Sequence, residues 1–210
     1  DGKMKGSKMD LAAIKNEFEE NGFAVVRQLF SPDEVAEIDA QVRAYIASVV
    51  PSLDVGDVFY EQAPSTAIKS LFRMHQHAVY FDKMRGHTGM LEIMRALLPG
   101  TIVCMDVGLF GKAAHDGSVT PPHQDNGFSY WEPPHCLKAS IALDAHTSDN
   151  GVMICQRGSH KIGVQPHRPS GVAGFSQMLA DPLDPELFPE VEVRMEPGDL
   201  CLHHTNTVHR

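Results

Sequence analysis

The sequence lacks any apolar run of the length that a membrane-spanning helix needs, about 20 residues. It also lacks an excess of positive charge: 18 Lys and Arg stand against 27 Asp and Glu, a formal net charge of −9 at pH 7. Sequence-independent binding of nucleic acid needs a basic surface. We therefore expect a protein that neither spans a membrane nor binds nucleic acid.

Cysteine is scarce, and the four cysteines are too far apart to form a Cys-X-X-Cys pair. A folded chain of this length does not need disulfides, so we expect reduced thiols and a cytoplasmic protein. Histidine, by contrast, occurs 12 times. An excess of histidine is a weak indication of metal binding until the spacing of the residues supports it.

The length of 210 residues suits one domain with a sizeable core. The first residues lack the apolar segment of a signal peptide. We expect residues 1–9 to be a leader or disordered, and residues 10–210 to form a single domain.

The first half of the chain reads as mainly helical. Leu11, Ile14 and Phe18 recur at helical spacing and Gly22 stops that helix. A second start combines a Ser31 cap, a proline in the first turn and Glu34 three residues after the cap. The expected helices cover residues 10–20, 31–48 and 88–98, and a short strand covers residues 23–26.

After residue 100, short β-prone runs are separated by turn-forming residues. Several short strands of this kind indicate a barrel or a sandwich. The expected fold class is α+β with a mainly β core and N-terminal helices packed outside it. Residues 166–189, with five prolines, are expected to form a long loop or lid. The expected strands cover residues 102–110, 139–143, 152–155, 191–195 and 200–202.

The sharpest chemical motif is Pro121-Pro122-His123-Gln124-Asp125. Residues i and i+2 of a strand share a face, so the imidazole of His123 and the carboxylate of Asp125 would converge. A histidine from a distant strand would complete a set of two histidines and one carboxylate, which leaves adjacent metal positions open, as in non-haem Fe(II) oxygenases. A surface pair without a metal is the alternative for this motif alone.

Two further motifs follow. A Pro197-Gly198-Asp199 turn leads into a strand that carries several histidines. An Asn150-Gly151 hairpin turn precedes a short strand and then His160, for which we favour a turn role over a ligand role.

In this order and at these separations, the motifs resemble the phytanoyl-CoA dioxygenase (PhyH) family of Fe(II)/2-oxoglutarate-dependent oxygenases. The resemblance covers nearly the whole chain and implies the family fold, a double-stranded β-helix (a cupin-like jelly roll) with helices packed outside. The segments that carry it are residues 21–26, 30–34, 123–125, 141–144, 150–151, 158–160 and 197–199.

By position, the resemblance implies that His123, Asp125 and His209 ligate Fe(II), with His204 as the second candidate for the distal ligand. It implies 2-oxoglutarate and dioxygen as co-substrates. The presence of Asp125 implies hydroxylation rather than halogenation. The family arginine that holds the far carboxylate of 2-oxoglutarate would lie beyond Arg210, together with the last barrel strand, so we expect the C-terminal strand to be missing from this sequence.

The resemblance also suggests co-substrate contacts by Lys112, Gln124 and Ser140, although an exposed, solvated Lys112 is the alternative. At Ser140, many relatives have a tryptophan. The residues after the His-X-Asp motif could line a substrate pocket or simply pack in the core: Asn126, Phe128, Tyr130 and Trp131.

The expected activity is hydroxylation of an unactivated C–H bond in a small organic substrate, with succinate and CO₂ as co-products. Two alternatives stay open. One is a cupin-like Zn or Mn hydrolase or isomerase, because the same donor set holds other divalent ions. The other is a non-catalytic binding protein with the PhyH fold.

Overall fold

The computed structural model describes residues 9–62, 64–172 and 174–210. The leader expected at residues 1–9 lies outside the described residues except for Met9. The helices are α1 (Leu11–Asn21), α2 (Pro32–Ser48), α3 (Met74–His77), α4 (Val79–Met84), α5 (Thr88–Leu97) and α6 (Asn126–Ser129), with 3₁₀ turns η1 (Val50–Ser52) and η2 (Ser159–Ile162). The strands are β1 (Phe23–Val26), β2 (Val58–Tyr60), β3 (Ile68–Leu71), β4 (Leu109–Phe110), β5 (Leu137–Ile141), β6 (Ile154–Gln156), β7 (His167–Val172), β8 (Phe175–Leu179), β9 (Glu190–Glu192) and β10 (Leu200–His204).

The three expected helices and the first strand are confirmed. Helix α1 begins where Asp10 accepts a hydrogen bond from the main-chain N–H of Ala13, and it ends at Gly22, whose φ of 85° is left-handed. Helix α2 begins with a capping box in which the main-chain N–H of Ser31 donates to Glu34 over 2.7 Å.

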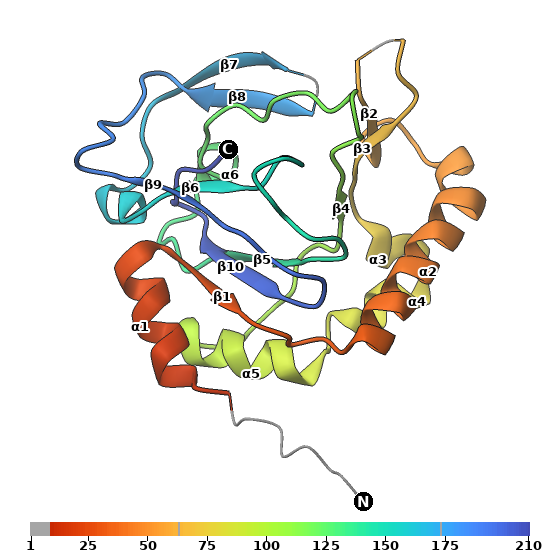
Figure 1. The fold of residues 1–210 in the computed structure, drawn as a ribbon, viewed down its shortest axis with the longest axis horizontal. Helices are drawn as coiled ribbons and strands as arrows, with labels where there is room; N and C mark the ends of the chain where they lie inside the picture. Colours follow the sequence, from red (N-terminus) through yellow and green to blue (C-terminus); the bar gives the residue numbers. More distant parts are fainter. Residues whose placement is uncertain (1–8, 63, 173) are drawn as a thin grey trace, which may run out of the picture.

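The sheet that positions the site has the order β1-β10-β5, with antiparallel pairing throughout (Figure 1). Alternate residues of β10 face opposite sides. Leu200 and Leu202 face one side and join the main core, whereas Cys201 on the other side packs with Phe23 in a second, smaller core. The sheet thus has a face covered by helices and a face turned toward the remaining strands.

The helices cover the first of these faces. Figure 1 shows α1 and α5 along one side of β1 and β10, and α2, α3 and α4 grouped beside them. Burial of apolar side chains between helices and sheet is the main stabilising contribution here. The helical residues buried in this core are Phe18, Val35, Ile38, Val42, Tyr45, Met74, Phe81, Ile93 and Met94.

Two expectations about the fold are wrong. Only Leu109–Phe110 of residues 102–110 is a strand, because Val107 instead accepts a hydrogen bond from Met74 at the start of α3 and its N–H donates to His75. Part of the loop expected over residues 166–189 is the β7–β8 hairpin, in which Pro169 is tolerated because β7 pairs on one side alone. The first half of the chain is mainly helical, as expected, but it also contains the short strands β2 and β3, which were not predicted.

Asp199 ties the turn before β10 to the segment after β1. Its side chain is 1% exposed and accepts hydrogen bonds from the main-chain N–H of Gln28 (2.8 Å) and of Glu196 (3.0 Å) and from Arg27 Nη1 (2.7 Å). The Pro-Gly-Asp motif therefore has a structural role that fixes where β10 begins.

Replacing Asp199 by alanine is expected to lower the free energy of unfolding by about 2–3 kcal/mol, because the main-chain donors lose their charged acceptor. Urea denaturation measures the loss. Asp39→Ala, which breaks an exposed pair with Arg43 on α2, is the control and should leave the midpoint nearly unchanged. Equal midpoints for the two variants would contradict the assigned role.

Stability at acid pH should depend on the same carboxylate. Burial alone would raise the pKa of Asp199, but hydrogen bonds from Glu196, Gln28 and Arg27 outweigh it and hold that pKa below its ordinary value. Such a group stabilises the fold above its unfolded-state pKa, about 3.9, and the contribution is lost as the pH falls through the folded-state pKa. The unfolding free energy of the wild type should therefore fall more steeply below about pH 4 than that of Asp199→Asn; parallel pH profiles would refute this.

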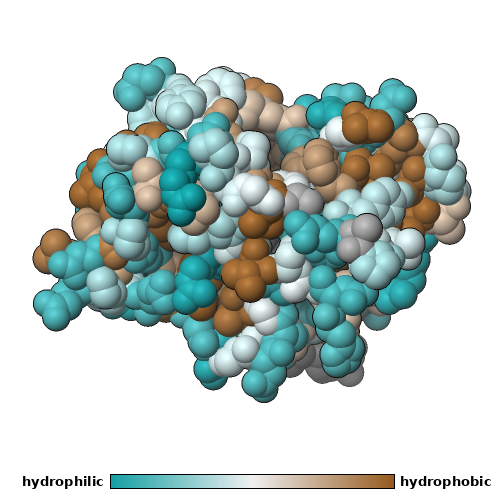
Figure 2. Space-filling view, turned by 90° about the horizontal axis from the view of Figure 1, so that it is seen from above, coloured by the Kyte–Doolittle hydropathy of each residue, from teal (hydrophilic) through white to brown (hydrophobic). Residues whose placement is uncertain are grey.

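Within the described ranges, no helix has the length and apolar character required to span a bilayer. In Figure 2, seen from the side of β7 and β8, hydrophilic residues break the apolar surface into separate patches. All four cysteines are free, and Cys155 and Cys201 are buried, where burial raises the pKa of the Cys201 thiol to about 12.

Candidate metal centre

Main-chain hydrogen bonds place His123 and His209 side by side. The two residues form an antiparallel bridge in which each N–H donates to the other's carbonyl over 3.0 Å. In such a hydrogen-bonded pair, both side chains lie on the same face, and the ring centroids are 4.2 Å apart. His209 also bridges to Cys155 of β6 on its other side. Residues far apart in sequence therefore hold the two imidazoles together.

Both rings are oriented by carbonyl groups of the chain. Nδ1 of His123 lies 2.9 Å from the carbonyl oxygen of Pro121, and Nδ1 of His209 lies 3.0 Å from that of Thr207. A carbonyl only accepts, so each Nδ1 carries the hydrogen and each Nε2 keeps a free lone pair. Burial lowers the pKa of both imidazoles. The neutral form with a free Nε2 is the form that ligates metals.

Asp125 completes the cluster from a different local structure than expected. It does not lie on a strand: it precedes α6 with a helical backbone, and this turn brings its carboxylate back toward His123. Its Oδ1 lies 3.7 Å from Nε2 of His123. The expected convergence of His123 and Asp125 is found, but a tight turn produces it rather than strand periodicity.

The carboxylate of Asp125 is held in its charged form. Burial alone would raise its pKa, but His209, the hydrogen bond from His203 and the charge of Lys138 outweigh burial and place the pKa well below its ordinary value. One ligand atom from each of His123, Asp125 and His209 lies within 4.8 Å of the other two. Two neutral imidazoles and one carboxylate in this arrangement fit a divalent transition-metal ion.

Two neighbours of the cluster, His203 and Lys138, were not among the predicted site residues. They lie opposite each other on β10 and β5, and both reach Asp125. Nε2 of His203 is 2.9 Å from Oδ2, and Nζ of Lys138 is 3.1 Å from Oδ1. Strand alternation could have found His203, because it shows that only one of the adjacent residues His203 and His204 can face the site.

The structure does not bring His204 to the cluster. His204 lies on the opposite face of β10, where its ring is 5.6 Å from His160 and 6.2 Å from Phe18. Burial, aided by neighbouring histidines, lowers its pKa to about 4. His160 lies in η2 with Nε2 3.2 Å from the carbonyl oxygen of Glu19, outside the donor set.

The three predicted co-substrate contacts are placed differently. Ser140 lies opposite Cys201 on β5. It is two residues from Lys138 and on the same face of the strand, so it is the next side chain along that face from the one that contacts Asp125. Gln124 is fully buried and donates to the carbonyls of Gly163 and Asn206, so both amide hydrogens are used inside the protein. Lys112 is exposed.

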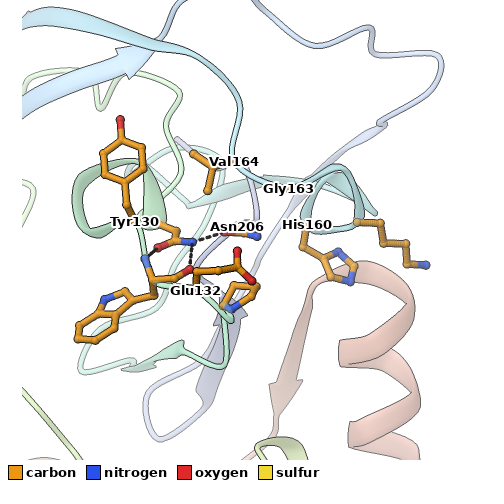
Figure 3. A pocket seen from close by; sticks show the side chains of 10 residues that line it. Tyr130, Glu132, His160, Gly163, Val164 and Asn206 are labelled. Atoms are coloured by element: carbon orange, nitrogen blue, oxygen red, sulfur yellow. Dashed lines mark hydrogen bonds between the residues drawn. The ribbon is translucent and has the colours of Figure 1, made fainter.

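The residues after the His-X-Asp motif divide between two environments. The ring of Phe128 packs edge-on against His123 at 5.7 Å, beside the cluster. Tyr130 and Trp131 instead line a surface cavity of about 490 Å³, to which Asn206 also contributes (Figure 3). Asn126 also lines this cavity, where it accepts a hydrogen bond from the N–H of Trp131 and donates one to Asn206 over 2.9 Å.

A buried ion pair lies behind the cluster. Lys69 on β3 and Glu61 are 3.7 Å apart with side chains only 6% and 2% exposed, and Ser118 donates to Glu61 over 2.8 Å. Nζ of Lys69 also lies 5.3 Å from the ring centroid of Phe175, which itself packs 5.1 Å from the ring of His123. The pair thereby supports one wall of the site.

Comparison with known proteins places this arrangement in a family. The family model for phytanoyl-CoA dioxygenase (PhyH) matches residues 18–210. The chain belongs to the PhyH family. The predicted family resemblance is thus confirmed over nearly the whole sequence.

Two curated proteins that are similar to this PhyH chain have different names. A protein of Stutzerimonas stutzeri named "Probable alpha-ketoglutarate-dependent hypophosphite dioxygenase" is 26% identical over 208 residues, 94% of this chain and 71% of the relative. The peroxisomal phytanoyl-CoA dioxygenase of Rattus norvegicus is 25% identical over 205 residues, 91% of this chain. The chain spans only 60% of the rat enzyme's length.

Among solved structures, EctD from S. alaskensis with bound Fe is similar at a TM-score of 0.77 and 20% identity, over 99% of this chain and 72% of that one. EctD from the same source has also been crystallised with 2-oxoglutarate and 5-hydroxyectoine, and it matches at a TM-score of 0.76. At this identity the likeness establishes the fold, which mixes helices and strands as expected.

Proposed function

We propose that this PhyH chain is an Fe(II)- and 2-oxoglutarate-dependent oxygenase that hydroxylates an unactivated C–H bond of a small organic substrate. The observation that carries the proposal is the buried set of two Nε2 atoms and one carboxylate, with both imidazole tautomers fixed by main-chain carbonyls. Relatives named as dioxygenases, and similar structures solved with Fe or with 2-oxoglutarate, support the choice of metal and co-substrate.

In this proposal His123, Asp125 and His209 hold the iron. Ser140, two residues from Lys138 on the same face of β5, contacts the co-substrate. The metal, together with 2-oxoglutarate and dioxygen, would supply the oxidising chemistry, with succinate and CO₂ as co-products. The chain's own residues orient the reactants and exclude water. Phe128 and Phe175, which pack against the ring of His123, shield one side of the cluster.

We further propose that residues 10–210 form one oxygenase domain whose β core is a double-stranded β-helix. Two small sheets support this. The bridge between His123, His209 and Cys155 continues through β6 to β9, and it faces the β1-β10-β5 sheet. The second core fills the space between the two sheets, with Phe23 and Cys201 from one side and Cys155, Val193 and Met195 from the other.

An anaerobic titration tests the function. Fe(II) and then 2-oxoglutarate are added to the full chain and to its His123→Ala variant, and the weak visible charge-transfer band of a chelated Fe(II)–2-oxoglutarate complex is recorded. We expect the band in the wild type and its loss in the variant. Fe(II) binding without a band would contradict the proposal and favour a metalloenzyme of another class or a binding protein.

A further inference from the structure

Lys138 places a positive charge beside the cluster of proposed metal ligands, although metal binding by His123, Asp125 and His209 does not require a cation there. It projects from β5 to Asp125, so that its Nζ and Nε2 of His203 contact different oxygens of one carboxylate. Within the described part of the chain, Asp125 is the carboxylate that lies within ion-pair distance of Lys138. Its charge is therefore not offset by any group other than a metal ligand.

The lysine spans the distance between the buried cluster and the solvent. Its side chain is 46% exposed, whereas that of Asp125 is 9% exposed. Nζ lies 5.4 Å from the ring centroid of Phe110, a residue of β4 that is 56% exposed. A small molecule that reaches the cluster from this side meets the ammonium group before it meets the ligands.

A bound metal ion would change the surroundings of this ammonium group. The oxygen that Lys138 contacts, Oδ1, is the one that lies 3.7 Å from Nε2 of His123 and therefore faces the metal position. A divalent cation there would repel Nζ, since like charges at a few ångströms in a poorly solvated site interact strongly. The flexible four-carbon stem lets Nζ move away from Oδ1 while it stays near the site. An anion bound next to the metal would then be its natural partner.

We propose that Lys138 is a specificity-determining residue that binds a carboxylate of a small anionic ligand at the metal centre. The inference rests on the proposed function and adds the ligand class, a small organic acid rather than a neutral molecule. Two sources of the carboxylate share this chemistry: 2-oxoglutarate itself, or the primary substrate. A lysine that merely orients Asp125 would have a different signature, as the following measurements separate.

Calorimetric titration of the full chain tests the proposal with Zn(II) in place of iron. Lys138→Met is compared with the wild type, with Lys138→Arg, and with Lys83→Met, a control at an exposed position of α4. Circular dichroism first establishes that each variant is folded. The metal is titrated alone, then 2-oxoglutarate, and then, at saturating 2-oxoglutarate, a series of C3–C6 monocarboxylic acids and their amides.

We expect Lys138→Met to bind Zn(II) as tightly as the wild type or more tightly, because a competing cation has been removed. Carboxylate affinity should fall about 10- to 100-fold, as for a lost charged hydrogen bond. Lys138→Arg should restore much of it, and Lys83→Met should behave as the wild type. A loss confined to the 2-oxoglutarate step identifies the co-substrate as the source, and a loss confined to the acids identifies the substrate.

Unchanged affinity for 2-oxoglutarate and for every acid would overturn the proposal while the proposed function stood. Weaker Zn(II) binding with unchanged carboxylate affinity would also overturn it, because Lys138 would then only position Asp125. If the wild type bound no Zn(II) in a manner that depends on His123, both this inference and the proposed function would fall. His123→Ala is included to distinguish that outcome.

Discussion

Replacing His209 by alanine is expected to remove stoichiometric metal binding and to lower 2-oxoglutarate consumption by at least about 100-fold, since even residues that only support a ligand contribute about 10- to 100-fold. His209 supplies one of two imidazole donors, and its ring lies within 4.5 Å of both neighbouring histidine rings, measured between centroids. Its main-chain bridge to His123 does not involve the side chain. The variant should therefore keep its fold, which circular dichroism checks.

His204→Ala is the matched control. His204 is a histidine of the same segment that faces away from the cluster, toward Phe18 and His160. Metal binding, followed by calorimetry, should be retained in His204→Ala and lost in His209→Ala. The opposite pattern would identify His204 as the distal ligand and would contradict the geometry described above.

The second large effect is expected at Glu61. Changing Glu61 to leucine should lower the free energy of unfolding by about 3–5 kcal/mol, because it leaves the ammonium group of Lys69 buried without its partner. Both side chains of the pair are almost fully buried, so water cannot replace the lost carboxylate. Urea denaturation followed by circular dichroism measures the change.

Replacing both members of the pair separates the charge from the packing. The double variant Glu61→Leu/Lys69→Met should recover most of the stability, because two apolar side chains of similar size leave no unpaired charge. A single variant that unfolds at the wild-type urea concentration would contradict the buried pair. A double variant no more stable than the single one would show that packing against Phe175, rather than charge, decides the effect.

How far the sequence predicted the site depends on which residues are considered. The His-X-Asp motif and the family resemblance together led to His123, Asp125 and His209, which the fold brings within reach of one another. They did not lead to His203, which strand alternation along β10 could have indicated, or to Lys138, whose approach to Asp125 depends on the pairing of β5 with β10 at a partner 65 residues away. Cross-strand register of this kind is set by tertiary packing, and no local pattern encodes it.

The fold was predictable where local chemistry decides the structure. The capping box of α2 and the glycine stop of α1 define those helices through contacts within a few residues. Residues 102–108 have strand propensity, yet the main-chain groups of Val107 bond to α3, so tertiary context overrides propensity there. Gln124 shows the same limit, since its neighbours at Gly163 and Asn206 are supplied by distant loops.

The bridge between His123 and His209 has a consequence for how such a site can diversify. The distance between the two imidazoles is set by main-chain hydrogen bonds, which any residue at the surrounding positions leaves in place. Side chains around the cluster, such as Phe128 and Lys138, can therefore be exchanged without moving the two imidazoles. A scaffold of this kind separates the reactive centre from the surface that selects its ligand, and new specificities are accessible through single substitutions in the walls.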